Sequence, residues 1–251
     1  MKLADAYGNK QFGLSFELFP PKTAKGEASL FQHVGQLAEF RPAYITCTYG
    51  AGGSTRDKTL DIVQRVHEEY GCAVASHLTC VGLTASQLKD YLGEAAERGI
   101  ENIVALRGDP PAGDTEFRAV EGGLKFANEL VSLIRSDFPE FGIAVAGYPE
   151  THQEAESPKA DLVNLKRKVE AGGDVVITQL FYNNDDYFRF RNACTDLGIT
   201  VPIVPGILPV TNYAQIQRIT SLCGAALPDN FASALKECGD DAERQFEVGV
   251  K

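Results

Sequence analysis

The stretch Leu14-Ser-Phe-Glu17-Leu-Phe-Pro-Pro21 opens a series of short apolar runs, each of which ends in polar residues suited to chemistry. Six further runs follow along the chain: 43–50, 73–77, 103–109, 143–149, 175–179 and 201–206. Their β-branched residues, and the helical stretches between them, predict parallel strands joined by crossover helices. The loops at the carboxyl ends of such strands build the active site. We therefore expect the polar residues that end these runs to converge on one site.

The spacing of the runs and the segments between them indicate a repeated strand–helix unit. The runs begin near residues 14, 43, 73, 102, 142, 174 and 201, which is a spacing of roughly thirty residues. Residues 29–40 and 59–70 have helical periodicity, and Thr84 and Gln87 have the spacing of a capping box. Four glycines fall where helices should stop, as left-handed caps do: Gly71, Gly99, Gly172 and Gly198.

Seven such units predict an α/β fold of the TIM (β/α)8 barrel type. A doubly wound sheet is the alternative, but the even spread of polar strand ends along the chain favours a closed barrel. After Gly206 the sequence predicts helices at 212–222, at 229–238 and from about 240, with no eighth apolar run before Lys251. We therefore expect residues 1–251 to form a single barrel domain that lacks its last strand and ends inside the last helix.

Composition excludes several classes of protein. The chain of 251 residues has a formal charge of −10, which opposes non-specific binding to nucleic acid. It has no apolar stretch of membrane-span length and no signal-peptide core at its start. Its six cysteines include no C-x-x-C pair, so we expect reduced thiols in the cytoplasm and no metal site. No P-loop is present, and the glycine-rich segment 50–54 does not match G-x-G-x-x-G.

Glu17 is the first candidate for catalysis, because it lies within an otherwise apolar strand and just before two prolines. Desolvation of a carboxyl group raises its pKa and lets it hold a proton near neutral pH. A general acid needs that property. The alternative interpretation is a structural glutamate paired with a buried arginine or lysine.

The end of the fourth strand and the end of the third are candidate ligand sites. In Arg107-Gly108-Asp109 the glycine lets a ligand ring approach the backbone, and the flanking charged side chains can bind the polar edges of that ring. A salt bridge without a ligand is the alternative there. His77 is a lone histidine with no metal partner at ligand spacing, and such a residue is more often structural. The long loop 110–123 is a candidate lid.

Residues 157–172 read as one helix with a serine cap, a proline at its first position and a glycine at its end. Asp161, Asn164 and Lys168 share a face of this helix. An acid, an amide and a base in one row suit a ribose and a phosphate. A solvated helix face would have the same pattern.

With these residues identified, the chain resembles the catalytic domain of bacterial methylenetetrahydrofolate reductases. The motifs that carry the resemblance occur in family order and span nearly the whole chain: Ser15-Phe-Glu17-Leu-Phe-Pro-Pro21, Thr48-Tyr49-Gly50, His77-Leu-Thr-Cys80, Ala105-Leu-Arg107-Gly108-Asp109, Tyr148-Pro-Glu-Thr-His152, Asp161-Leu-Val-Asn164-Leu-Lys-Arg167-Lys168, Ile177-Thr-Gln179-Leu-Phe181 and Pro205-Gly-Ile-Leu-Pro-Val210. Singly most of these motifs are weak, but together they are highly specific.

The resemblance implies a flavin-dependent oxidoreductase of one-carbon metabolism that supports methionine biosynthesis. Such an enzyme is a TIM barrel that holds FAD non-covalently, takes a hydride from NADH or NADPH in a ping-pong reaction, and reduces 5,10-methylenetetrahydrofolate to 5-methyltetrahydrofolate. By motif match, Glu17 is similar to the general acid that opens the folate imidazolidine ring. Asp109 is similar to the residue near the flavin and the pterin, where its charge would make the reduced flavin a stronger donor.

The same resemblance assigns the ligand contacts. The FAD-binding positions are Thr48, His77, Arg107, Gly108, Asp109, Phe126, Ala127, Tyr148, His152, Asp161, Asn164, Arg167 and Lys168. Arg167 and Lys168 are the expected partners of the diphosphate. Folate would contact Asp109, Gln179 and Gln215, and Gln179 would also lie where the nicotinamide stacks. The family pattern further implies a homo-oligomer.

The chain departs from the family pattern in three ways. Leu18 replaces an expected phenylalanine, and Ser76 replaces a usual proline before His77, so that the strand end could bend differently. The eighth strand, which would bring an arginine to the folate, is missing. Two alternatives therefore stay open: a pterin-binding TIM-barrel methyltransferase without flavin, and an inactive truncated fragment.

Overall fold

The computed structural model describes residues 1–49, 56–110, 113 and 116–250, so the glycine-rich segment 50–54 and part of the loop 110–123 lie outside the described residues. The chain divides into two compact units. The first unit comprises Met1–Val145 and Arg167–Val175, and the second comprises Ala146–Lys166 and Val176–Lys251. That residues 1–251 form one barrel domain, incomplete at its C-terminal end, stays a prediction.

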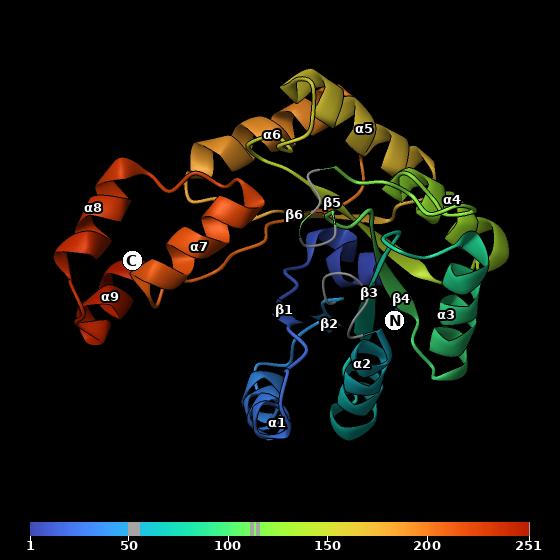
Figure 1. Cartoon of the computed structure of the whole chain (residues 1–251), viewed down its shortest axis with the longest axis horizontal. Helices are drawn as coiled ribbons and strands as arrows, with labels where there is room; N and C mark the ends of the chain where they lie inside the picture. Colours follow the sequence, from blue (N-terminus) through green and yellow to red (C-terminus); the bar gives the residue numbers. More distant parts are fainter. Residues whose placement is uncertain (50–55, 111–112, 114–115, 251) are drawn as a thin grey trace. The chain divides into compact units, whose positions relative to one another are not determined.

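Strands and helices alternate along the whole described chain (Figure 1). The strands are β1 (Ser15–Leu18), β2 (Tyr44–Cys47), β3 (Val74–Thr79), β4 (Asn102–Leu106), β5 (Gly142–Gly147), β6 (Val175–Thr178) and β7 (Ile203–Val204). A 3-10 helix covers Leu3–Lys10, and the α-helices are α1 (Ala24–Ala38), α2 (Arg56–Tyr70), α3 (Ala85–Glu97), α4 (Ala127–Asp137), α5 (Pro158–Glu170), α6 (Asn184–Asp196), α7 (Tyr213–Cys223), α8 (Asp229–Glu237) and α9 (Ala242–Gly249).

The strand order confirms the predicted α/β class. In the first unit β1 to β5 are parallel neighbours in chain order, whereas a doubly wound sheet would reverse its order at a switch point. In the second unit β6 pairs with β7 in parallel. Seven parallel strands alternating with helices are the pattern of a TIM barrel that lacks one strand. Helices α7, α8 and α9 follow β7 at the predicted positions, and no eighth strand occurs in the described part of the chain.

The first unit is held together by an apolar core and by a few buried polar side chains. Leu60, Leu88 and Ile103, from α2, α3 and β4, are fully buried. Asn102 is also fully buried, and its amide accepts a hydrogen bond from Leu3 N and donates to the carbonyls of Met1 and Val74. Because a buried polar group is stabilised only when it is paired, this amide fixes the N-terminal segment against β3 and β4.

Local signals in the sequence set the helix ends. Thr84 and Gln87 form the predicted capping box at the start of α3. The four glycines predicted as stops, Gly71, Gly99, Gly172 and Gly198, all have a positive φ. The helices therefore end where side chains other than glycine would be strained.

The C-terminal helices of the second unit pack around a small core of their own. Val210, Ile216 and Leu235 form its buried centre. The side chain of Gln245 on α9 is buried, accepts a hydrogen bond from Tyr213 N at the start of α7, and donates to the carbonyl of Gly239. This amide ties the three helices together. Among the described residues we find no helix that is both long and apolar enough to cross a membrane.

Candidate functional site

The carboxylate of Glu17 and the imidazole of His77 meet on one face of the first unit. Glu17 is in register with Thr46 on β2, and Thr46 is in register with Ala75 on β3. Because side chains alternate along a strand, His77 projects to the same face as Ala75 and therefore as Glu17. The distance from His77 Nε2 to Glu17 Oε2 is 3.4 Å. Residues of β1 and β3 that are sixty positions apart in the sequence are thus brought together.

The two groups occupy different environments. The His77 side chain is 9% exposed, and burial lowers its pKa to about 4, so the imidazole is neutral at pH 7. The Glu17 side chain is 43% exposed, yet the surrounding protein atoms still raise the pKa of its carboxyl group by desolvation. The contact is therefore not an ion pair at neutral pH. The alternative in which Glu17 pairs with a buried cation finds no support among the described residues, because burial alone raises this pKa.

Arg107, Gly108 and Asp109 follow β4 directly, as predicted. Gly108 has a φ of +87°, and a Cβ atom there would lie 2.6 Å from Val81 Cγ2. Only glycine fits such a close approach. Arg107 donates from Nε to the Gly108 carbonyl, and its guanidinium carbon lies 5.0 Å from the centroid of the Phe117 ring. Asp109 is exposed.

The start of α2 holds the ends of β1 and β2. Lys58 Nζ donates to the carbonyl of Pro21 at 2.7 Å and lies 3.6 Å from Glu27 Oε2. Thr59 Oγ1 donates to the carbonyl of Thr48 at 3.0 Å and is fully buried. Neither contact is predictable from the sequence, because a side chain that binds a distant carbonyl leaves no periodic pattern there.

Three residues assigned to FAD by resemblance form a compact cluster in the second unit. The rings of Tyr148 and His152 meet edge to face at 4.7 Å between centroids. Asp161 Oδ2 accepts a hydrogen bond from His152 N at 2.9 Å, and Asp161 is buried. Thr151 has a φ of +96°, which is strained for a β-branched residue, and such strain is concentrated at functional sites. Asp161 therefore has a structural partner in addition to its assigned ligand.

The other assigned residues have varied surroundings. On α5, Asn164 and Arg167 are exposed and Lys168 is half-buried, and the division between the units runs through this helix. In the second unit, Gln179 follows β6 directly and its Oε1 accepts a hydrogen bond from Leu180 N. Gln215 lies in the first turn of α7 and is exposed.

The remaining assigned positions belong to the first unit. Thr48 follows β2 and is half-buried. Phe126, the N-cap residue of α4, is 56% exposed, and Ala127 begins that helix. Ser76 does not end its strand: β3 continues to Thr79, and the hydroxyl groups of Ser76 and Tyr91 lie 2.6 Å apart.

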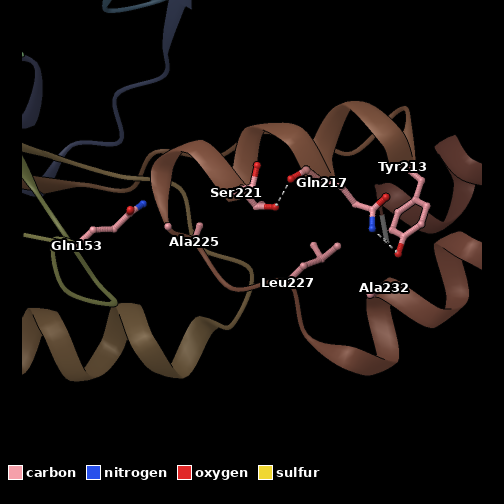
Figure 2. A pocket seen from close by; sticks show the side chains of 9 residues that line it. Gln153, Tyr213, Gln217, Ser221, Ala225, Leu227 and Ala232 are labelled. Carbon is pink, nitrogen blue, oxygen red and sulfur yellow. Dashed lines mark hydrogen bonds between the residues drawn. The ribbon is translucent and has the colours of Figure 1, made fainter. Parts of the chain in front are cut away.

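The two described cavities are lined by residues other than the assigned ones. One, of about 450 Å³, is in the second unit, where Figure 2 shows Gln153 near Ala225 at one end of α7, and Gln217 and Tyr213 toward the other end. The other, of about 560 Å³, lies near the N-terminus in the first unit, beside Phe12 and Arg41. Neither contains an assigned residue. Within the described residues there is no cluster of three His, Cys, Asp or Glu side chains that could hold a metal ion.

The described residues of the first unit fit a polar cofactor such as a flavin in one respect. His77 Nε2 is buried and has no hydrogen-bond partner among the described residues, so a polar ligand atom could satisfy it. At Gly108 the space that a side chain would fill is occupied by Val81 and Thr79, so this glycine serves the close packing of the chain after β4.

Comparison with known proteins is consistent with the resemblance seen in the sequence. A family model described as "Methylenetetrahydrofolate reductase" matches residues 2–251. The maize "Methylenetetrahydrofolate reductase (NADH) 1" is 40% identical over 259 residues, which cover 99% of this chain and 44% of that protein. The Escherichia coli "5,10-methylenetetrahydrofolate reductase" is 39% identical over 248 residues, which cover 99% of this chain and 81% of that protein. The chain thus spans less than half the length of the plant relative.

One solved structure shares the fold at low sequence identity. It is an uncharacterized protein from Clostridium thermocellum described as binding two copies of 5-methyl-5,6,7,8-tetrahydrofolic acid. The TM-score is 0.64 at 16% identity, and the match covers 99% of this chain and 84% of that chain. At this level of identity the likeness shows the fold alone.

Proposed function

The chain belongs to the methylenetetrahydrofolate reductase family, and we propose that it reduces 5,10-methylenetetrahydrofolate to 5-methyltetrahydrofolate for methionine biosynthesis. Non-covalently bound FAD would supply the chemistry, by taking a hydride from NADH and passing it to the folate. The maize relative carries NADH in its name, which supports NADH as the electron donor. The Escherichia coli relative, whose name gives the same reduction, supports the substrate.

The raised pKa of the Glu17 carboxyl group, which results from desolvation, is the observation that carries this proposal. Folate reduction requires a proton at the ring nitrogen that leaves the one-carbon bridge, and a carboxyl group of raised pKa can hold that proton near neutral pH. Its side chain is 43% exposed, so a substrate can reach it. Glu17 is therefore the general acid of the proposed reaction.

The other residues bind and orient the reactants. Asp109 is exposed next to Gly108, whose φ is positive, and would hydrogen-bond the pterin, together with Gln179 and Gln215. Arg167 and Lys168 carry the positive charge that a diphosphate requires, and Asp161, Asn164, Tyr148 and His152 would hold the rest of the cofactor. Thr48, His77, Arg107, Phe126 and Ala127 complete the proposed FAD contacts.

A Glu17→Gln variant separates the proposed acid from the binding residues. Glutamine keeps the shape of the side chain but cannot donate a carboxyl proton, so anaerobic reduction of bound FAD by NADH should persist while folate reduction falls at least about a hundredfold. Glu97→Gln, on an exposed position of α3, is the matched control and should change neither half-reaction. Equal losses in both half-reactions of Glu17→Gln would remove the assigned role.

Two alternatives predict different results from the same preparation. A methyltransferase without flavin would be colourless and would still bind folate, and an inactive fragment would bind neither ligand. The proposed enzyme should be yellow, and anaerobic NADH should bleach it. A homo-oligomer in the cytoplasm remains our prediction, and light scattering during size-exclusion chromatography tests the oligomeric state.

A further inference from the structure

We propose that His77 is a positioning residue for the general acid: its neutral imidazole accepts, at Nε2, the hydrogen bond of the protonated Glu17 carboxyl group. This inference rests on the proposed function of Glu17 and adds a partner that holds its proton until the folate takes it. It differs from the FAD contact assigned to His77 by resemblance. The two roles have different experimental consequences.

The geometry that supports the contact is local to the first unit. His77 Nε2 and Glu17 Oε2 are 3.4 Å apart, and Nε2 has no hydrogen-bond partner among the described residues. A buried nitrogen without a partner is costly, and a small rotation of the half-exposed Glu17 side chain would shorten the contact to a hydrogen bond. The carboxyl group therefore has one buried acceptor within reach.

The protonation states of the neighbours give the direction of that hydrogen bond. Burial lowers the pKa of His77 to about 4, so the ring is neutral at pH 7 and one of its nitrogens can accept a hydrogen bond. The carboxyl group of Glu17 has a raised pKa, which favours the form that donates. On β2, burial and, to a lesser extent, the Glu17 charge raise the pKa of Cys47 to about 12, so its thiol stays neutral.

No described cation contributes to the pKa of Glu17, and the register neighbour of His77 on β4 is the apolar Val104. A protonated imidazole at this position would favour the carboxylate and work against a general acid. Burial of His77 therefore has a consequence for catalysis: it keeps a positive charge away from Glu17 while leaving a hydrogen-bond acceptor there.

Substitutions at His77 test the proposal by changing the acceptor while keeping the volume. In His77→Leu the acceptor is lost, so the pKa of Glu17 should fall by about one unit and folate reduction at pH 7 should slow about tenfold. In His77→Gln the amide oxygen can accept the hydrogen bond, so most of both effects should be restored. Both variants are assayed at saturating FAD, and NADH-driven flavin reduction reports any loss of cofactor binding that the substitutions cause.

A readout that does not depend on activity comes from the carboxyl group itself. The pKa of Glu17 can be followed by infrared difference spectroscopy of the protein during pH titration, with Glu17→Gln to identify its band. Adding His77→Leu to Glu17→Gln should cause no further loss of folate reduction, because both changes act on one proton.

The outcomes separate this inference from the proposed function. If the parent protein reduces folate but the pKa of Glu17 in His77→Leu stays constant or rises, the acceptor role is wrong. If His77→Leu and His77→Gln lose FAD and both half-reactions alike, His77 only binds the cofactor and the inference is also wrong. If the parent protein itself does not reduce folate, the proposed function fails, whereas the pKa titration still tests the contact.

Discussion

Substitution of Gly108 by alanine should destabilise the first unit more than the same substitution at a glycine with equal backbone strain. Gly108 has a φ of +87° and Gly99 a φ of +75°, so an alanine at either position would cost about 1–2 kcal/mol in the left-handed region. At Gly99 no heavy atom of the described residues lies within 4 Å of the added Cβ. At Gly108 that atom would lie 2.6 Å from Val81 Cγ2 and 3.0 Å from Thr79 Cβ.

The difference between the two variants therefore measures the close packing at Gly108. Overpacking a buried site costs about 1–3 kcal/mol. We therefore expect the free energy of unfolding to fall by about 2–5 kcal/mol in Gly108→Ala. In Gly99→Ala it should fall only by the cost of the left-handed backbone, about 1–2 kcal/mol. Urea unfolding followed by circular dichroism measures both losses. FAD binding should weaken only in Gly108→Ala, because Arg107 and Asp109 flank that position.

A third variant tests the named contact. Val81→Ala removes the Cγ2 atom nearest to the added methyl group, so combining it with Gly108→Ala should cost less than the two single changes together. Equal losses for Gly108→Ala and Gly99→Ala, or strictly additive losses with Val81→Ala, would refute the steric reasoning.

Two further predictions concern single buried groups. In Asp161→Ala the backbone N–H of His152 loses its acceptor, so the free energy of unfolding should fall by about 2 kcal/mol. Asp161→Asn keeps an acceptor, so the free energy of unfolding should fall by about half as much. Equal losses for the two variants in urea unfolding would contradict this prediction. His77 has a pKa of about 4 when folded against an ordinary 6.5, so the unfolded chain binds more protons between these values and stability falls as the pH drops through that window. The parent should lose roughly 3 kcal/mol relative to His77→Gln between pH 6.5 and 4, and parallel unfolding curves for the two proteins would contradict the assigned protonation state.

The strand positions could be predicted from the sequence because each buried parallel strand is a short β-branched run closed by turn residues. The expected start near residue 102 and the observed start of β4 at Asn102 coincide, and α7 and α8 begin within one residue of expectation. The predicted run 73–77 ends two residues before β3 does, because the polar residues Ser76, His77 and Thr79 interrupt the apolar pattern although all are buried in the strand.

The candidate site could be predicted only in part. Motif order gave the identity of Glu17 and His77, but their contact depends on the register of β1, β2 and β3, which no local pattern specifies. Lys58 and Thr59 bind the carbonyls of Pro21 and Thr48, and a backbone carbonyl is present at every residue. Such contacts can be found only in a structure.

The buried amide of Gln245 has a consequence for how heat would inactivate the protein. It holds the first residue of α7, two positions before Gln215, so fraying of α9 would reach the proposed folate side while β1 and β3 of the first unit were still intact. Warming should then weaken folate affinity at temperatures where NADH still bleaches the flavin. A substitution that stabilises α9 would therefore extend folate reduction to higher temperatures and leave the reduction of the flavin by NADH unchanged.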